Sequence, residues 1–412
     1  MIKNLFGILK KNENRKIIAS YLVLTAVAIS MLQLILFYSF FSFWGTFSVV
    51  MTYVATALIF LSVLMVITEL SNKIKILWLC FFVVFAISFC ISGYALEYVF
   101  NTIKVLGLLT VLPNIKMNKK IIYVIFFIYI LYASLVALLA DRDLYETNTI
   151  ILNTNTSSFI CLCAEIVLVA LSLTLKKAGK MLCFIGALLF VVMQFTFSGR
   201  ASLIGTVLIV LYIAFQKYFD KISQKTIKII AICLCFGAII FALAYLGLYK
   251  LLGDDVYFLG KDIFSGREAI WADAFNQVNA ERGWFFGIGG RFRSTSVSTG
   301  NVGNLSLHNQ MMAYYTLYGA LPLIAFVLLF VNLTEKSSIR KSKFFTVFLF
   351  VIMIVSYFET LIFYTSTVQN VVLALILAYF FTQDKEEPKM EQTQEELNIE
   401  QTNLTEDKHE EQ

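Results

Sequence analysis

The chain has 412 residues, of which 59% are hydrophobic and 15% are charged, and its mean hydropathy is +0.79. This composition is typical of a protein that crosses a membrane many times, and it excludes a soluble globular domain. The net charge of +6 comes mostly from lysines in short segments between apolar ranges, so it does not indicate a nucleic-acid partner.

Apolar ranges close to the length of about 20 residues that a helix needs to cross a bilayer follow one another along the chain. We expect twelve of them, at 17–37, 47–67, 76–92, 94–112, 121–140, 158–175, 181–197, 201–216, 227–247, 310–331, 344–364 and 367–381. The sequence therefore predicts an all-α integral membrane protein with about twelve transmembrane helices and one large extracytoplasmic loop.

The distribution of lysine and arginine predicts how these helices are oriented. If residues 1–16 are cytoplasmic, the short loops on that side carry sixteen basic residues, and the opposite short loops carry only Arg142 and Arg200. Basic residues in short loops favour the cytoplasmic side of a membrane. We therefore expect a multi-pass plasma-membrane protein with both termini inside the cell.

One long polar segment interrupts the apolar pattern. Residues 248–308 separate spans one to nine (17–247) from spans ten to twelve (309–381), and the predicted orientation puts this segment outside the cell. A long loop in a compact protein is more often functional than ornamental. The tail, 382–412, is rich in Glu and Gln, and we expect it to be disordered in the cytoplasm. No internal repeat is visible, which counts against an inverted-repeat transporter.

Ionisable residues inside the predicted spans are few. Glu97 and Lys104 lie seven residues apart on one helical face, where they form either an ion pair or one wall of a polar cavity. Glu165 is a lone acid in span six, which either faces a cavity or reaches water near an end. The seven cysteines show no metal-ligand spacing, and Asp254-Asp255 fits a turn better than a metal pair. We expect neither a metal nor a cofactor.

Two arginines are predicted in the first turn of a helix on the outer side. Ser198 fits an N-cap and Gly199 a tight turn, which places Arg200 at the start of span eight. The segment Ser265-Gly-Arg-Glu268 has the spacing of a capping box, with Arg267 in the first turn. Apolar residues then recur at helical spacing and predict a short amphipathic helix on the bundle or in the membrane interface: Ile270, Trp271, Ala274, Phe275 and Val278.

A glycine-rich segment, Gly283–Gly290, follows that helix and directly precedes Arg291 and Arg293. It is too short for a dinucleotide-binding fold and lacks the strand and helix that frame one. We expect a turn that lets another part of the backbone approach closely.

Arginine and lysine are separated in this sequence. Nearly all lysines lie on the predicted inner side, whereas six of the eight arginines lie on the outer side: Arg142, Arg200, Arg267, Arg282, Arg291 and Arg293. The guanidinium group binds phosphate oxygens with two parallel hydrogen bonds, which an ammonium group does not do. The outer arginines therefore predict a lipid phosphate or diphosphate ligand, with Arg282, Arg291 and Arg293 among the residues that bind it.

His308 is the only histidine outside the C-terminal tail, and it lies at the start of span ten. Histidine is the side chain that most often acts as a general base in catalysis. Beside the arginines it predicts glycosyl transfer from a lipid diphosphate. The arginines stabilise the charge of the leaving group in place of a metal ion, and His308 deprotonates the hydroxyl of an acceptor sugar.

Four short stretches resemble those of one known family: Thr196-Phe-Ser-Gly-Arg200, Arg267 to Trp271, Gly287-Ile-Gly289, and His308-Asn-x-x-Met312 with Gly319. Over about Gln194–Gly319 the chain is similar to the O-antigen polymerase and ligase superfamily, in which leucine is usual where Met312 stands.

That resemblance implies transfer of glycan from undecaprenyl diphosphate. It assigns the diphosphate to Arg200 and Arg267 and the role of base to His308. We also expect Asn309, next to His308, among the substrate-binding residues. The implied partners are an undecaprenyl-diphosphate-linked oligosaccharide, the lipid bilayer and other membrane proteins of polysaccharide assembly.

We expect a polysaccharide polymerase of the O-antigen or capsule type, which moves a growing glycan onto the sugar of an incoming lipid-linked repeat unit. Two alternatives stay open. One is a ligase of the same superfamily that passes finished polymer to another acceptor. The other is a flippase or exporter that moves lipid-linked sugar without chemistry.

Overall fold

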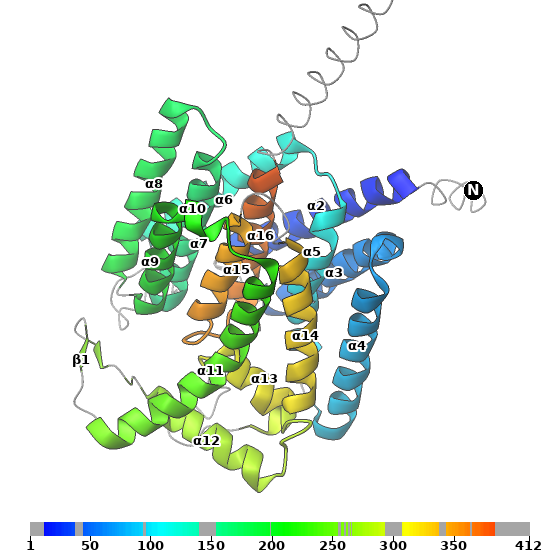
Figure 1. Ribbon diagram of the computed structural model, residues 1–412, viewed down its shortest axis with the longest axis vertical. Coiled ribbons are helices and arrows are strands. Elements are labelled where there is room, and N and C mark those ends of the chain that lie inside the picture. Colours follow the sequence, from blue (N-terminus) through cyan, green and yellow to red (C-terminus); the bar gives the residue numbers. More distant parts are fainter. Residues whose placement is uncertain are drawn as a thin grey trace, which may run out of the picture.

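Helices make up almost all of the described structure (Figure 1). The computed structural model describes residues 12–37, 44–93, 96–139, 154–197, 199–253, 257–258, 261–262, 264, 266–292, 307–337, 343–362 and 365–383. The helices before the long polar segment are α2 (Asn12–Phe37), α3 (Trp44–Met65), η1 (Ile67–Glu69), α4 (Asn72–Ser92), α5 (Leu96–Val111), η2 (Leu112–Asn114), α6 (Lys119–Leu139), α7 (Thr154–Ser172), α8 (Lys177–Thr196), α9 (Arg200–Ala214), α10 (Gln216–Phe219) and α11 (Gln224–Leu252).

The polar segment and the last third of the chain add a two-stranded antiparallel hairpin and six further helices. They are β1 (Tyr257–Phe258), β2 (Lys261–Asp262), α12 (Arg267–Ala280), η3 (Gly289–Arg291), α13 (Gln310–Tyr318), α14 (Ala320–Ser337), α15 (Phe344–Val355) and α16 (Thr365–Gln383). The predicted loop 248–308 therefore contains regular structure in its described part, including the helix that the apolar spacing predicts.

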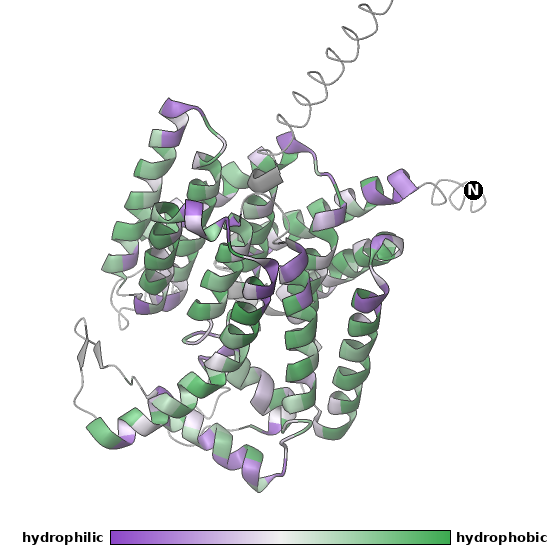
Figure 2. Ribbon diagram, in the orientation of Figure 1, coloured by the Kyte–Doolittle hydropathy of each residue, from purple (hydrophilic) through white to green (hydrophobic). Residues whose placement is uncertain are grey.

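Among the described residues, seven helices are long and apolar enough to cross a membrane, and they lie within α2, α3, α4, α6, α7, α8 and α11. Three further apolar helices are shorter: Arg200–Ala214, Phe344–Val355 and Val368–Phe380. Most turns of the helices are hydrophobic, and hydrophilic residues gather mainly at helix ends and along α12 (Figure 2). The molecule is thus a helical protein of membrane type, whereas the count of twelve spans and the orientation remain predictions.

The interior of the bundle is built around α7. All side chains of α7 from Ser157 to Ser172 are buried, and the helix packs against α6, α8, α9 and α16. Helices at the perimeter instead expose large apolar side chains, such as Leu138 (75% exposed) and Leu182 (69% exposed). Water would disfavour such a surface, whereas the hydrocarbon of a bilayer accommodates it.

The predicted span 310–331 is wrong as a single helix, because it breaks at Gly319 into α13 and α14. Gly319 has φ +88, a conformation that side-chain-bearing residues rarely adopt. A Cβ atom at Gly319 would lie 2.3 Å from the backbone carbon of Phe285. Hydropathy misses this break because glycine interrupts the helix without interrupting the apolar pattern.

The prediction that the glycine-rich segment allows close backbone approach is confirmed. A Cβ atom on Gly287 would lie 2.4 Å from the backbone carbon of Leu317, and one on Gly289 would lie 2.2 Å from the backbone oxygen of Gly93. The turn therefore docks against both the α13–α14 junction and the end of α4. This contact fixes the end of α12 relative to the bundle.

Candidate functional site

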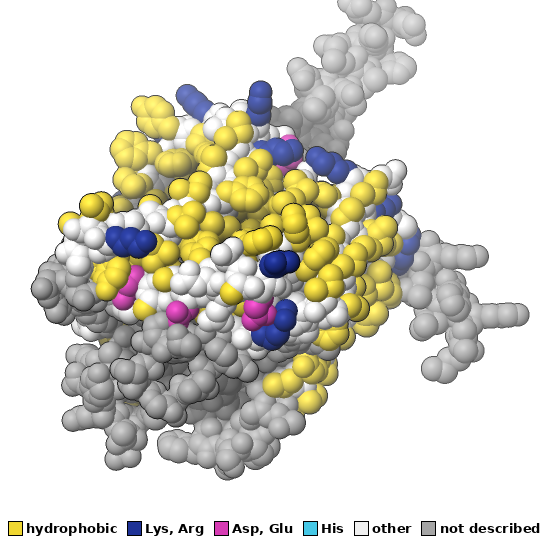
Figure 3. Space-filling view, turned by 90° about the horizontal axis from the view of Figure 1, so that it is seen from below, with side chains coloured by type: hydrophobic (Ala, Val, Ile, Leu, Met, Phe, Trp, Pro, Cys, Tyr) yellow, Lys and Arg dark blue, Asp and Glu magenta, His cyan; other side chains and the backbone are white. Residues whose placement is uncertain are grey.

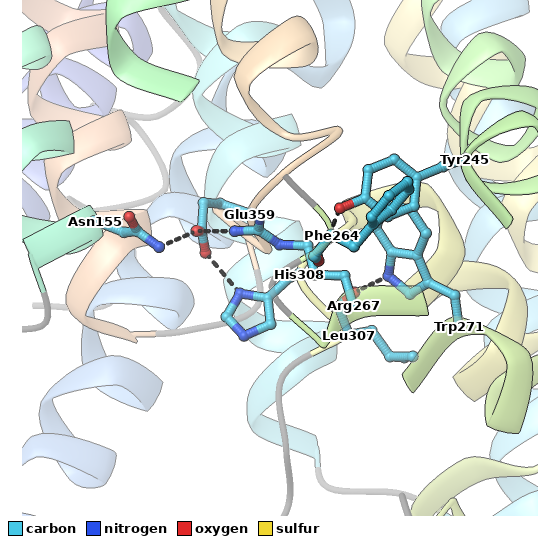
Figure 4. Close-up of polar contacts among 8 residues, drawn as sticks. All are labelled: Asn155, Tyr245, Phe264, Arg267, Trp271, Leu307, His308 and Glu359. Atoms are coloured by element: carbon cyan, nitrogen blue, oxygen red, sulfur yellow. Dashed lines mark hydrogen bonds and ion pairs between the residues drawn. The ribbon is translucent and has the colours of Figure 1, made fainter. Parts of the chain in front are cut away.

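A single carboxylate, Glu359, joins residues from three distant parts of the chain (Figure 4). It lies in the connection between α15 and α16 and accepts a hydrogen bond of 2.8 Å from Asn155 Nδ2. Arg267 Nη2 lies 3.3 Å from the same carboxylate oxygen, Oε1, and His308 Nδ1 lies 3.1 Å from Oε2. These side chains are 13–24% exposed: Arg267 13%, Glu359 17% and His308 24%. The site is thus half-buried at one end of the bundle.

The backbone holds His308 in a rare conformation. Its φ is +47, a region that costs a residue other than glycine about 1–3 kcal/mol unless its surroundings enforce it. On one side, the carbonyl oxygen of Leu307 accepts a 2.6 Å hydrogen bond from the buried Trp271 indole. On the other side, Asn309 caps helix α13. Such strain is typical of functional positions.

The side chain of Asn309 makes structural hydrogen bonds, and its predicted role in substrate binding stays a prediction. Its side chain is fully buried, and its oxygen accepts a hydrogen bond of 3.0 Å from Met312 N. Its amide nitrogen donates to the carbonyl oxygen of Ala238 at 3.0 Å. Asn309 therefore ties the start of α13 to α11, directly after His308.

Arg267 is the first residue of α12, as predicted, but the predicted capping box is not what begins this helix. The N-cap is Gly266, which has φ +74 and makes no side-chain cap hydrogen bond, while Ser265 lies outside the described residues. The preceding Phe264 is fixed by a 2.8 Å hydrogen bond from Tyr245 OH to its carbonyl oxygen. The Nε atom of Arg267 is buried and has no partner among the described residues. A buried donor of this kind is normally hydrogen-bonded, so it would favour an acceptor at this position.

The first turn of α7 links this cluster to Arg200. Asn155 bonds Glu359, and Ser158, three residues later on the same helix face, packs against Gly199. A Cβ atom on Gly199 would lie 1.8 Å from Ser158 Oγ, so only glycine permits this contact. Arg200 then begins α9, as predicted, although the N-cap is Gly199 and Ser198 lies outside the described residues. Arg200 and His308 thus belong to the same end of the bundle.

The other outer arginines lie apart from Glu359 or outside the description. Arg291 forms a surface ion pair of 2.9 Å with Glu281 and is 54% exposed. Arg282 is exposed beside the glycine-rich turn. Arg142, Arg293 and Asp254-Asp255 lie outside the described residues. The grouping of Arg282, Arg291 and Arg293 as ligand-binding residues therefore stays a prediction.

Glu359 was not identified from the sequence. It falls inside the range 344–364, which hydropathy predicts to be a span, but the structure ends helix α15 at Val355. The available signal was an acid within an apolar range, because such residues are expensive in a membrane and mark functional sites.

The ionisable residues within the spans do not join this cluster. Glu165 is buried and accepts hydrogen bonds of 2.8 Å from Gln194 Nε2 and 2.6 Å from Thr206 Oγ1. Packing among α7, α8 and α9 thus accounts for it, rather than exposure to water near an end. Lys104 is fully buried, and the side chain of Glu97 lies outside the described part, so their predicted pairing stays open. Among the described residues no group of three or more His, Cys, Asp or Glu is placed to hold a metal.

The cluster is suited to moving a proton. With Nδ1 of His308 donating to Glu359, the lone pair of the neutral imidazole lies on Nε2, and the ring edge with that nitrogen points away from Glu359 (Figure 4). A carboxylate also stabilises the imidazolium that forms when Nε2 accepts a proton. Arg267 adds a guanidinium group within the same cluster.

Known proteins add no further support for a function. No model of a known protein family matches the sequence, and no curated protein matches it.

Proposed function

We propose that this protein is a membrane glycosyltransferase that polymerises polysaccharide from a lipid-diphosphate-linked donor. The observation that carries the proposal is the contact of His308 and Arg267 with one carboxylate, Glu359, at the end of an apolar helical bundle. A general base and a phosphate-binding cation side by side are what sugar transfer from a diphosphate needs.

In the proposed complex the lipid diphosphate lies against Arg267 and Arg200. One Nη group of Arg267 pairs with Glu359, and its buried Nε group donates a hydrogen bond to a phosphate oxygen. Arg200 lies at the positive N-terminus of α9, where the helix dipole adds to its attraction for an anion. The isoprenoid chain of the donor extends into the bilayer.

The reaction is a displacement at the anomeric carbon of the donor sugar. The acceptor hydroxyl forms the new bond to that carbon and gives its proton to Nε2 of His308. The bond between the anomeric carbon and the phosphate oxygen breaks, and its electron pair leaves with the lipid diphosphate. Glu359 holds the imidazole in place and stabilises its positive charge, which makes it a positioning residue.

Replacing Glu359 by glutamine tests this arrangement. The amide keeps the shape of the side chain but loses the charge, and a hydrogen bond to a charged group contributes about 1.5–3 kcal/mol. We expect kcat to fall roughly tenfold to a hundredfold with little change in the KM for the lipid-linked donor. Glu335→Gln is the control, because Glu335 forms a different ion pair, with Lys228 (3.3 Å), in the last turn of α14. Equal activities of the two variants would remove Glu359 from the mechanism.

Arg200→Lys separates phosphate binding from a general need for charge. Lysine keeps the charge but loses the two parallel donors of the guanidinium group. We expect a loss of roughly tenfold to a hundredfold in turnover, nearly as large as for Arg200→Ala. Full activity of Arg200→Lys would instead favour a contact with lipid headgroups.

The proposed orientation predicts which surfaces are accessible from outside the cell. In a variant without the seven native cysteines, Asn279→Cys on the exposed side of α12 should react with a membrane-impermeant maleimide in intact cells. Lys177→Cys, exposed at the start of α8, should react only after lysis. The opposite pattern would place the site in the cytoplasm and rule out an extracytoplasmic polymerase.

A further inference from the structure

The glycine-rich turn after α12 is fixed at the ends of two apolar helices. The carbonyl oxygens of Trp284 and Phe285 accept hydrogen bonds from Ala320 N (2.8 Å) and Leu321 N (3.2 Å), the first residues of α14. Gly290 N donates to the carbonyl oxygen of Gly93, just beyond the last residue of α4, at 2.9 Å.

Two serines strengthen this attachment. Ser88 and Ser92, near the end of α4, both donate to the carbonyl oxygen of Phe286, at 2.8 and 3.2 Å. Trp284 and Phe285 therefore lie at the depth where α4 ends and α14 begins.

Both aromatic side chains point out of the protein. Trp284 is 43% exposed and Phe285 is 59% exposed, although their backbones are tightly held. The two helices that hold the turn also expose apolar side chains near it: Ile91 at the end of α4 is 58% exposed, and Leu321 at the start of α14 is 39% exposed. Helices α4 and α14 pack against each other, so the aromatic pair lies beside apolar helices that expose hydrophobic side chains.

Charged groups of both signs flank the aromatic pair. Arg282 is exposed two residues before Trp284, and Arg291 is 54% exposed just after the turn, beside Glu281. Viewed from that end, basic and acidic side chains lie scattered among hydrophobic ones on the described surface (Figure 3). An aromatic pair bordered by arginine, at the end of apolar helices, is the composition found at membrane–water interfaces.

We propose that Trp284 and Phe285 insert into the interfacial layer of the lipid bilayer and anchor α12 to the membrane. The occupant of this surface is phospholipid: its upper acyl chains meet the two aromatic rings, and its phosphate groups meet Arg282 and Arg291. The turn continues directly from α12, since Gly283 N donates to the carbonyl oxygen of Val278 at 2.8 Å. The anchor therefore sets the depth of the whole helix, including Arg267 at its other end.

Trp284 and Phe285 take no part in the proposed reaction, so the anchor can be tested without measuring activity. Its test places the photoreactive amino acid benzoylphenylalanine at Phe285, an aromatic replacement for an aromatic residue, in the otherwise native chain. Leu328, 47% exposed on α14, is the membrane control, and Asn279, exposed on α12, is the aqueous control.

After reconstitution in phosphatidylethanolamine and phosphatidylglycerol vesicles, irradiation should add the mass of one phospholipid to the peptide that contains position 285. The same shift is expected at position 328 and not at position 279. If position 285, like position 279, gains no phospholipid mass, the proposed membrane anchor is wrong. Cross-linking of position 285 to a second protein chain in place of lipid would also contradict it. The position-328 control shows in each case that the protein is folded and in the membrane.

Discussion

Replacing His308 is expected to remove most of the turnover and leave the protein intact. General-base catalysis contributes about 10²–10⁴-fold, so His308→Ala should lower the rate of sugar transfer by that factor. His308→Asn is the more informative change, because asparagine tolerates a positive φ and can donate to Glu359, but it cannot accept a proton. We expect both variants to reach normal levels in the membrane and to bind the lipid-linked donor normally.

The material that accumulates in cells with His308→Asn separates the three candidate functions. A blocked polymerase leaves single repeat units on the carrier lipid at the outer face. A blocked ligase leaves long chains there, still bound to the carrier. A blocked flippase leaves single units facing the cytoplasm, where an added glycosidase does not reach them. We expect the first pattern, and lipid-linked units found only on the inner leaflet would exclude the enzyme proposal.

The second large effect is expected on folding, at the break between α13 and α14. A Cβ atom at Gly319 would lie 2.3 Å from the backbone of Phe285, and the residue needs φ +88. Overpacking costs about 1–3 kcal/mol and the left-handed backbone about 1–2 kcal/mol more, so Gly319→Ala should lose roughly 2–5 kcal/mol of unfolding free energy. Thermal unfolding of detergent-solubilised protein measures this change.

Gly247→Ala is the matched control for that substitution. Gly247 lies inside α11, and a Cβ atom there would have no neighbour within 4 Å. Because alanine favours a helix interior by about 0.5–1 kcal/mol over glycine, this variant should be as stable as the native protein or slightly more stable. Unfolding temperatures that do not distinguish the two variants would contradict the close contact between the glycine-rich turn and the α13–α14 junction.

Periodicity and glycine spacing predicted the parts of this structure that depend on local sequence. The amphipathic pattern of Ile270, Trp271 and Ala274 gave a helix whose buried face is the one expected. The glycine-rich turn was recognisable because several glycines within eight residues have few explanations other than close backbone contact. The positions of Arg200 and Arg267 in the first turns of helices were likewise predicted from the sequence.

Contacts between distant segments could not be predicted from the sequence. Glu359 approaches His308 across 51 residues and Asn155 across 204, and no local pattern encodes either pairing. The hydrogen bond from the Asn309 amide to the carbonyl oxygen of Ala238 likewise joins residues 71 positions apart, and no local pattern predicts it. Glu359 also fell within a predicted span, because one acidic residue lowers the mean hydropathy of a long apolar range very little.

We propose that the protein itself forms glycosidic bonds at the cluster of His308, Glu359 and Arg267. Purified protein in vesicles, supplied with a repeat unit linked to undecaprenyl diphosphate, tests it most directly when the products are separated by size. The proposal predicts products that grow by one repeat unit at a time, with one lipid diphosphate released per bond, and none of either with His308→Asn. Native protein that moves the lipid-linked unit across the membrane without joining two units would contradict the claim.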